Sequence, residues 1–161
     1  GPAAGQEPET ERLIREAARA LSALFLTAAL IQTPAPAPER AAVEAPIQAY
    51  FRYHRTGDPQ GLVEAFHPAS LLQWSEKGQR KILTQAEWRA SATAKAAQAK
   101  GPRPEVRCEI AWLEVAGDAA TAKVVLDYPT FRFIDYLHLL KLEGRWAIVD
   151  KVYHREDRPA R

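Results

Sequence analysis

The sequence predicts an α+β fold, in which helices gather on one side of an antiparallel sheet. Two observations carry this prediction. The patterns typical of helices all lie before Gly101-Pro102, whereas the patterns after it are typical of strands. Short turn sequences separate the last four strand patterns, and such turns join antiparallel neighbours. These turn sequences are Gly117-Asp118, Pro129-Thr130 and Glu143-Gly144.

Length and composition fit one globular domain with an extension. The chain has 161 residues, of which 47% are hydrophobic and 26% are charged. We expect an N-terminal extension over residues 1–38 and a folded domain over residues 39–161. The net charge is +2 and the basic residues are scattered, so nucleic acid is not an expected partner.

Neither a disulfide nor a metal site is predicted. The single cysteine, Cys108, lies in the alternating apolar segment VRCEIAWLEV, which favours a buried, unreactive thiol over a nucleophile. The four histidines include no pair at the spacing of metal ligands. We therefore expect a protein without a cofactor.

The extension contains an amphipathic helical pattern over residues 11–32, followed by the Pro/Ala linker TPAPAPE. Its apolar run LSALFLTAALI is too short to span a bilayer. One interpretation is a secretory signal, which would make the protein exported. The preceding charges sum to −1, however, where a signal is positively charged. The alternative is a helix that docks on the domain or on a second subunit of a cytoplasmic protein.

Two helices are predicted at the start of the domain. The first runs over residues 39–57 and ends at Gly57, and Pro46 suggests that its regular part begins near that proline. The second is short, with Asp58 as N-cap, Pro59 at its first position and Pro68 at its end. The apolar face of the first helix consists of Val43, Ile47, Tyr50, Phe51 and His54.

A hairpin and a third helix follow. The hairpin is predicted over residues 70–84 with its turn near Lys77-Gly78. The third helix opens with Thr84 and Glu87 at capping-box spacing and continues through an alanine-rich run toward Gly101. Strands are then predicted over residues 105–115, 120–128, 132–142 and 145–154.

Three segments of the domain resemble the nuclear-transport-factor-2-like superfamily, also called the cystatin-like cone. They are YFRYHRTGDPQGLVEAFHP, VAGDAATAKVVLDYP and FIDYLHLLKLEGRWAIVDKVYH, of which the last is the most specific. Within the superfamily the chain looks most similar to bacterial polyketide-cyclase-like domains labelled "putative lumazine-binding". The resemblance implies a curved antiparallel sheet wrapped around N-terminal helices to form a conical pocket, and a homodimer. It implies no single activity, because the superfamily includes isomerases, dehydratases, cyclases and non-catalytic binding modules.

The alternation of side chains predicts which residues face the pocket. If Pro129-Thr130 is a two-residue turn, Asp135 lies opposite Val124 as the one polar residue of an apolar face. If Glu143-Gly144 is also a two-residue turn, Asp135 lies opposite Val152 on the last strand. The residues of the last strand on this face are then Trp146, Ile148, Asp150, Val152 and His154, whereas Lys151 and Tyr153 point outward. A bulge would change this assignment.

Asp135 and His154 are accordingly the predicted catalytic pair. Burial in an apolar cavity disfavours the charged form of a carboxyl group, and such a group can serve as a general acid or base. His154 would relay the proton or orient the acid. The alternatives are structural: Asp135 pairs with a backbone group, or with Lys151 if the register slips by one, and His154 is an exposed or structural histidine.

The predicted ligand is a small hydrophobic compound bound by aromatic side chains. Hydroxyl groups of the first helix could donate to a developing oxyanion, and tryptophans could form pocket walls. The predicted ligand-binding residues are Tyr50, Tyr53, Trp74, Trp88 and Tyr128. Two functions remain open: a cofactor-free acid/base enzyme of the isomerase, dehydratase or cyclase type, and a non-catalytic binding or assembly module. An open cavity lined by Asp135 would favour the first, and an interior filled by aromatic side chains the second.

Overall fold

The computed structural model describes residues 35–98 and 101–159. The predictions for residues 11–32 lie outside the described residues. The elements are, in order, α2 (Ala37–Thr56), α3 (Gln60–Ala65), β1 (Phe66–Glu76), β2 (Gln79–Thr84), α4 (Gln85–Ala96), β3 (Arg107–Ala116), β4 (Ala119–Asp127), β5 (Phe131–Leu142) and β6 (Arg145–Asp157). None of the described helices is long and apolar enough to cross a membrane.

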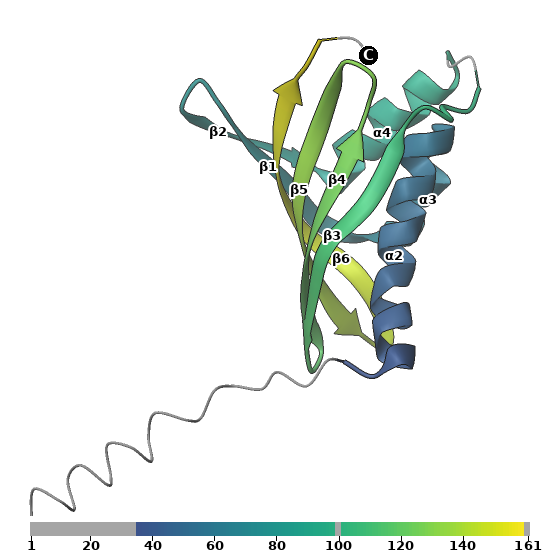
Figure 1. The fold of residues 1–161 in the computed structure, drawn as a ribbon, viewed down its shortest axis with the longest axis vertical. Helices are drawn as coiled ribbons and strands as arrows, with labels where there is room; N and C mark the ends of the chain where they lie inside the picture. Colours follow the sequence, from purple (N-terminus) through teal and green to yellow (C-terminus); the bar gives the residue numbers. More distant parts are fainter. Residues whose placement is uncertain (1–34, 99–100, 160–161) are drawn as a thin grey trace, which may run out of the picture. The chain divides into compact units, whose positions relative to one another are not determined.

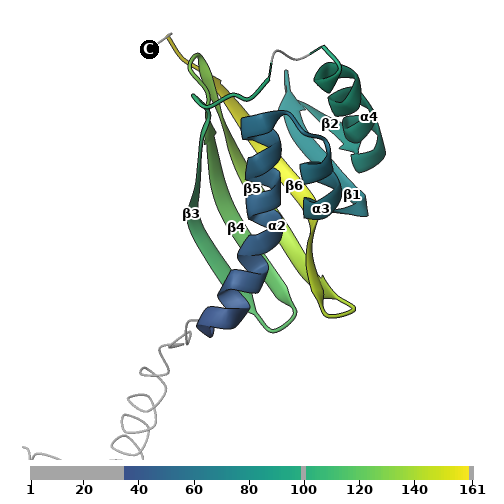
Figure 2. The ribbon, with the colours of Figure 1, turned by 90° about the vertical axis from the view of Figure 1, so that its right-hand side faces the viewer.

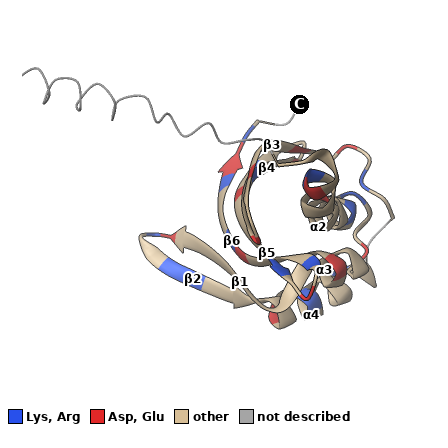
Figure 3. Cartoon of the chain, turned by 90° about the horizontal axis from the view of Figure 1, so that it is seen from below, with Lys and Arg blue, Asp and Glu red and all other residues tan. Residues whose placement is uncertain are grey.

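The six strands form one sheet in the order β2-β1-β6-β5-β4-β3. All neighbours are antiparallel except β1 and β6, which pair in parallel. The three helices cover one face of this sheet (Figures 1 and 2). Seen from one end, the sheet is curved and unclosed, and α2 lies within its curve (Figure 3). The predicted α+β fold with a curved sheet around helices is therefore confirmed.

The helix α2 supplies the centre of the core. Its predicted apolar face is buried, from Val43 through Tyr50 to His54. The helix ends at Gly57, which has φ 78° and donates a hydrogen bond to the carbonyl of Tyr53. Contrary to expectation, the helix does not begin near Pro46 but runs through it from Ala37.

The start of α2 is fixed to the β5–β6 hairpin by Glu39. This carboxylate accepts hydrogen bonds from the indole of Trp146 at 2.9 Å and from Lys141 at 3.2 Å. These two bonds lower the pKa of Glu39, the bond from Trp146 having the larger effect. Long-range contacts of this kind hold the helix in one direction across the sheet.

The helix α3 packs so closely on α2 that only glycine fits at Gly61. A Cβ atom at this position would lie 2.6 Å from the carbonyl oxygen of Ala49 and 3.0 Å from the backbone nitrogen of Tyr53. Asp58 accepts a hydrogen bond from the backbone of Gln60, but the predicted start of the helix is one residue too early: Pro59, not Asp58, is the N-cap of α3, and the helix begins at Gln60. Pro68 does not follow a helix end but lies inside β1.

The other local predictions are largely confirmed. The β1–β2 hairpin turns at Lys77-Gly78, and Thr84 and Glu87 form the capping box that opens α4. That helix ends at Ala96, earlier than expected. In β4 and β5, Val124 pairs with Asp135 as predicted.

The prediction for β6 is confirmed in its first half and wrong in its second. Leu142 pairs with Arg145 across the Glu143-Gly144 turn, and Trp146 and Ile148 are buried as expected. Next, the register shifts: Leu139 pairs with Ile148 but His138 pairs with Asp150, so Val149 has no partner across the strands.

This bulge reverses the faces of all following residues of β6. Lys151 pairs with Leu137 and Tyr153 pairs with Asp135, so both belong to the interior face, the face of the sheet toward α2. Asp150, Val152 and His154 point to the opposite, outer face. The exposed fraction of Lys151 is 4%, whereas that of Val152 is 42%.

Candidate functional site

The interior of the sheet contains a buried polar cluster of Asp135, Tyr50 and Lys151. The exposed fractions of these residues are 0%, 0% and 4%. The hydroxyl of Tyr50 donates to Oδ2 of Asp135 at 2.6 Å. The amine of Lys151 donates to the same oxygen at 3.2 Å and to the Tyr50 hydroxyl at 2.8 Å. The three groups therefore form a closed triangle of hydrogen bonds between α2, β5 and β6.

Burial controls the ionisation of this cluster. Burial lowers the pKa of Lys151, and the charge and hydrogen bond of Asp135 offset only part of that effect. Burial, followed by the charge of Asp135, raises the pKa of Tyr50 well above its ordinary value. The hydroxyl of Tyr50 consequently keeps its proton and acts as a donor to the carboxylate.

Aromatic rings surround the amine of Lys151. It lies 4.5 Å from the ring centroid of Tyr153, 5.0 Å from Trp88 and 5.9 Å from Phe133. It also lies 5.2 Å from the ring of Tyr50. Ring faces attract a cation at such distances, so these contacts compensate some of the lost hydration of the ammonium form.

A second polar pair, His54 and Tyr128, lies beside the cluster. Nδ1 of His54 is hydrogen-bonded to the hydroxyl of Tyr128 at 2.6 Å, and the His54 ring packs edge-on against Tyr50 at 4.5 Å. Burial lowers the pKa of His54 well below its ordinary value, with smaller effects from the charges of Lys151 and Arg103. The imidazole is therefore neutral at neutral pH. Burial raises the pKa of Tyr128 to about 12.

Of the buried polar atoms without a hydrogen-bond partner among the described residues, two belong to the Asp135 cluster and the His54–Tyr128 pair. They are Oδ1 of Asp135 and Nε2 of His54. Leaving a buried polar atom unpaired costs about 1–3 kcal/mol, more for a charged group. Such atoms are candidates for bonding a ligand or water inside the fold.

A hollow of about 710 Å³ opens where β1 and β6 end. Its aromatic walls are Trp74, Phe133 and Tyr153, and the ring centroids of Trp74 and Tyr153 are 5.4 Å apart. Phe133 and Tyr153 thus face the hollow and also contact the amine of Lys151. Neither Asp135 nor Lys151 is among the residues that line the hollow.

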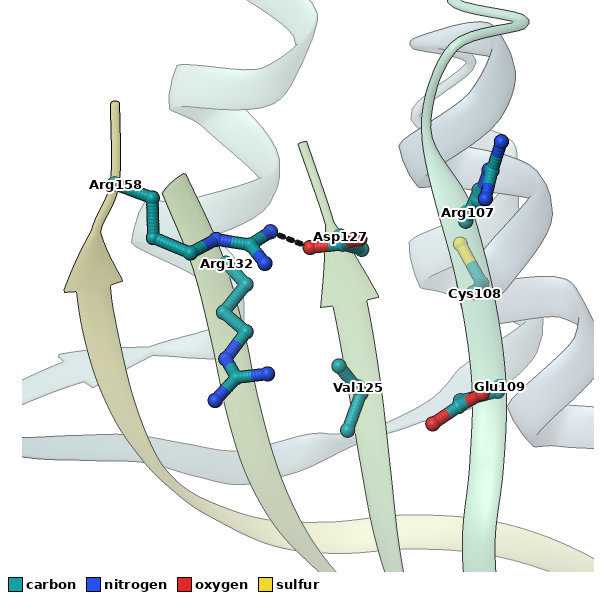
Figure 4. Close-up of a pocket in the computed structure, with 7 residues that line it drawn as sticks. All are labelled: Arg107, Cys108, Glu109, Val125, Asp127, Arg132 and Arg158. Carbon is teal, nitrogen blue, oxygen red and sulfur yellow. Dashed lines mark ion pairs between the residues drawn. The ribbon is translucent and has the colours of Figure 1, made fainter. Parts of the chain in front are cut away.

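A smaller hollow, of about 260 Å³, lies on the outer face where β3 begins and β4 ends (Figure 4). Figure 4 shows that Arg158 is paired with Asp127 there. A second arginine of this hollow, Arg132, is paired with Glu156 at 2.7 Å. Because carboxylates of the sheet already hold these two guanidinium groups, we do not place the functional site in this hollow.

Comparison with protein families identifies the chain. Residues 38–154 match the model of the family described as "Putative lumazine-binding". The chain belongs to this family. Comparison with curated proteins found no match.

Solved structures show the same fold as this lumazine-binding-family domain. A nuclear-transport-factor-2-like protein of unknown function from Silicibacter pomeroyi is 26% identical with a TM-score of 0.62, and the match covers 74% of this chain and 97% of that one. A second such protein, from Shewanella baltica, is 24% identical with a TM-score of 0.67, covering 77% and 98%. A third, from Methylobacillus flagellatus, is 21% identical with a TM-score of 0.63, covering 75% and 94%.

The fold brings most of the predicted site residues together. Asp135 and Tyr50 are in direct contact, and the ring of Trp88 packs on Tyr50 at 5.8 Å and on Tyr53 at 5.7 Å. Tyr128 joins this group through His54. Trp74 lies apart from them, on the wall of the hollow. Their roles in binding remain predictions.

The predicted position of His154 is wrong. The bulge at Val149 pairs His154 with Ile134 on the outer face, where its side chain is exposed. His154 therefore does not share a face with Asp135, and the expected proton relay between the two has no geometric support. The alternative reading of Asp135 as the partner of Lys151 is the one realised, because the register slips by one residue.

Three residues of the interior were not predicted as site residues: Lys151, Tyr153 and His54. The first two were assigned to the outer face because the bulge has no distinctive signal in the sequence. His54 was correctly predicted to lie on the apolar face of α2. A histidine between apolar positions is a signal for a buried polar group, and it could have suggested a partner such as Tyr128.

Proposed function

We propose that this domain binds a small hydrophobic ring compound in its interior and that Asp135 acts on it as a general acid or base. The observation that carries the proposal is the hydrogen bonding of the Asp135 carboxylate. Its Oδ2 is held by Tyr50 and Lys151, whereas its Oδ1 is buried without a partner. A ligand that donates a hydrogen bond to Oδ1, or loses a proton to it, would give this oxygen the partner that it lacks.

The surrounding groups support a ligand with an aromatic or aliphatic ring. Phe133, Tyr153 and Trp88 provide apolar surface on the sides of the cluster. The phenol of Tyr50 keeps its proton and would support the negative charge of Asp135. The family description makes lumazine, a planar heterocycle with N–H donors, one compound to test.

Ligand-induced thermal stabilisation tests the proposal. Lumazine and a set of small cyclic ketones and phenols are each added to the protein, and the melting temperature is followed. A ligand at one hundred times its dissociation constant stabilises by about 2.7 kcal/mol, which is readily measured. We expect Asp135→Asn to reduce the ligand-induced shift, whereas Asp150→Asn, on the outer face of β6, retains it. If no compound shifts the wild-type melting temperature, the binding proposal fails.

Proton exchange tests the catalytic part. A cyclic ketone bound in the site should exchange the hydrogens next to its carbonyl for deuterium in D₂O, which proton NMR detects. The exchange should be lost in Asp135→Asn and retained in Asp150→Asn. Binding without protein-dependent exchange would leave a binding domain that is not an enzyme.

The second candidate function is a non-catalytic binding or assembly module that forms a homodimer. One observation favours it: a row of half-exposed apolar side chains crosses the outer face of the sheet. Cross-strand pairing through Gln73 and Lys123 aligns this row. Its members are Ile82, Val152, Tyr136 and Trp112, with exposed fractions of 47%, 42%, 41% and 43%. Aromatic side chains filling the interior also favour this function.

A second copy of the chain is the proposed occupant of this row. A two-fold axis through the outer face of the sheet would bring the same patch of both copies together and bury these four side chains. Light scattering after size exclusion measures the mass. We expect Tyr136→Arg to give a monomer, whereas Val63→Arg, on an exposed apolar residue of α3, leaves the dimer intact. A monomeric wild-type protein at high concentration would exclude this function.

A further inference from the structure

Lys151 is a charged group in the interior of the fold. The proposed acid–base action of Asp135 gives it no chemical role. Its side chain is almost fully buried, although lysine is among the residues most rarely found inside proteins. The amine lies 2.8 Å from the Tyr50 hydroxyl and 3.2 Å from Oδ2 of Asp135. A structural role alone would not explain why a desolvated amine lies between the Tyr50 hydroxyl and the Asp135 carboxylate, two groups that can transfer protons.

We propose that the amine of Lys151 forms an imine with aldehyde or ketone ligands of the interior site. This inference rests on the proposed binding function and deepens it, because it names carbonyl compounds as the ligand class. It also gives Lys151 a direct chemical role beside that of Asp135.

The geometry provides what imine formation needs. Only the uncharged fraction of an amine is nucleophilic, and burial lowers the pKa of Lys151 despite the neighbouring carboxylate, so this fraction is larger than in an ordinary lysine. Proton transfer needs donors and acceptors next to the nitrogen, and Tyr50 and Asp135 both lie within hydrogen-bond distance. The dry, aromatic surroundings oppose hydrolysis of the product.

A route for the ligand starts in the hollow at the ends of β1 and β6. Phe133 and Tyr153 form its walls and also lie over the amine, at 5.9 Å and 4.5 Å from their ring centroids. A ring-bearing aldehyde in the hollow would replace part of the contact that these two residues make with Lys151. Its carbonyl carbon would then meet the nitrogen.

The reaction is balanced without a further reagent. The lone pair of the neutral amine attacks the carbonyl carbon, a C–N bond forms, and the carbonyl electrons move to oxygen. A proton passes from the nitrogen to that oxygen through Tyr50 and Asp135, which gives a carbinolamine. The hydroxyl takes up a proton through Asp135 and leaves as water when the C–O bond breaks, and the nitrogen returns its remaining proton to Asp135 to give the imine.

Reductive trapping of the full-length protein tests the proposal. Benzaldehyde and cyanoborohydride convert an imine into a stable secondary amine, so the labelled peptide gains the mass of the aldehyde minus one oxygen. We expect peptide mapping to locate the main adduct at Lys151 at neutral pH. Lys123 is the matched control, because its amine also lies near a tyrosine ring, that of Tyr136 at 5.8 Å, but on the outer face. A lowered pKa raises the neutral fraction of an amine, so Lys151 should label faster than Lys123.

Variants separate this reaction from general reactivity. Lys151→Arg keeps the positive charge beside Asp135 but cannot form the imine, so it should lose the adduct, whereas Lys123→Arg should keep it. Mapping of the wild-type adduct decides the question even if Lys151→Arg folds poorly. Labelling spread evenly over exposed lysines would overturn the proposal.

Benzyl alcohol distinguishes failure of the inference from failure of the binding function. It has the same ring but no carbonyl group. If benzyl alcohol raises the melting temperature and benzaldehyde does not label Lys151, imine formation is excluded and the binding site stands. If neither benzyl alcohol nor any compound of the binding set shifts the melting temperature and Lys151 is not labelled, both proposals fall. Labelling at Lys151 supports both.

Discussion

The hydroxyl of Tyr50 lies 2.6 Å from Oδ2 of Asp135, although 85 positions separate the two residues in the sequence. This bond joins the central helix α2 to the middle of the sheet. Both residues are fully buried, so the bond is shielded from water. The hydrogen bond between Tyr50 and Asp135 therefore contributes both to the stability of the domain and to the geometry of the candidate site.

Removing one charge of the Asp135–Lys151 pair should destabilise the domain strongly. Asp135→Asn leaves the Lys151 amine buried without a counter-charge, and breaking such a pair costs about 3–5 kcal/mol. Replacing both residues, as in Asp135→Asn with Lys151→Met, removes the uncompensated charge and should recover most of the loss. Urea unfolding of the four proteins measures this coupling. Additive losses in the double variant would show that the two residues do not depend on each other.

Tyr50→Phe should cost about 1–3 kcal/mol of unfolding free energy, because it removes the hydroxyl that links Lys151 to Asp135. The shape of the core is otherwise preserved. Tyr136→Phe makes the same chemical change at a side chain that is 41% exposed, where effects stay within about 0.5 kcal/mol. Equal effects of the two substitutions in chemical denaturation would argue against the hydrogen-bonded triangle.

Stability should fall with decreasing pH below about 6.5, the ordinary pKa of histidine. Burial lowers the pKa of His54 in the folded state, so the unfolded state binds more protons between the folded pKa and about 6.5. The unfolding free energy then decreases by at most about 1.4 kcal/mol per pH unit as the pH falls through this window. His54→Gln should flatten this slope. His154→Gln, at an exposed position, should preserve it, and a slope unchanged by His54→Gln would refute the assignment.

Gly61→Ala should separate α3 from α2. The new methyl group would lie 2.6 Å from the carbonyl oxygen of Ala49, so the backbone of one helix must move. Overpacking of this kind costs about 1–3 kcal/mol. Gln60→Ala, at the exposed first residue of the same short helix, is the control for a change in helix composition. Calorimetry of the two variants should show a clearly lower melting temperature for Gly61→Ala alone.

Local rules predicted the parts of the fold that depend on short stretches of sequence. Gly57 ends a helix because it adopts a left-handed conformation, and Thr84 and Glu87 open a helix by capping each other. The Glu143-Gly144 turn fixes the first pairs of β5 and β6. Each of these features is decided by a few neighbouring residues, and each was found as expected.

The candidate site was predicted only in part, because it depends on registers far from any turn. Asp135 was identified because two strands and one turn define its face, and no bulge intervenes between Val124 and the turn. Lys151 was missed because the extra residue Val149 reverses the faces beyond it. Pairing in a sheet is a tertiary property, and valine carries no local preference that reveals a bulge.

Val149 is therefore one extra residue in β6 that has no partner in β5. In a comparison by sequence position alone, the interior Lys151 would align with an outer-face residue of any relative whose strand has no such extra residue. Deleting Val149 would make the strand regular and leave Lys151 opposite Leu137, whereas pairing Val149 with His138 would exchange the two faces of the strand end and bring Asp150 to the place now held by Lys151. Two carboxylates, those of Asp135 and Asp150, would then meet in the interior, so the bulge at Val149 separates a charge-balanced centre from a repulsive one.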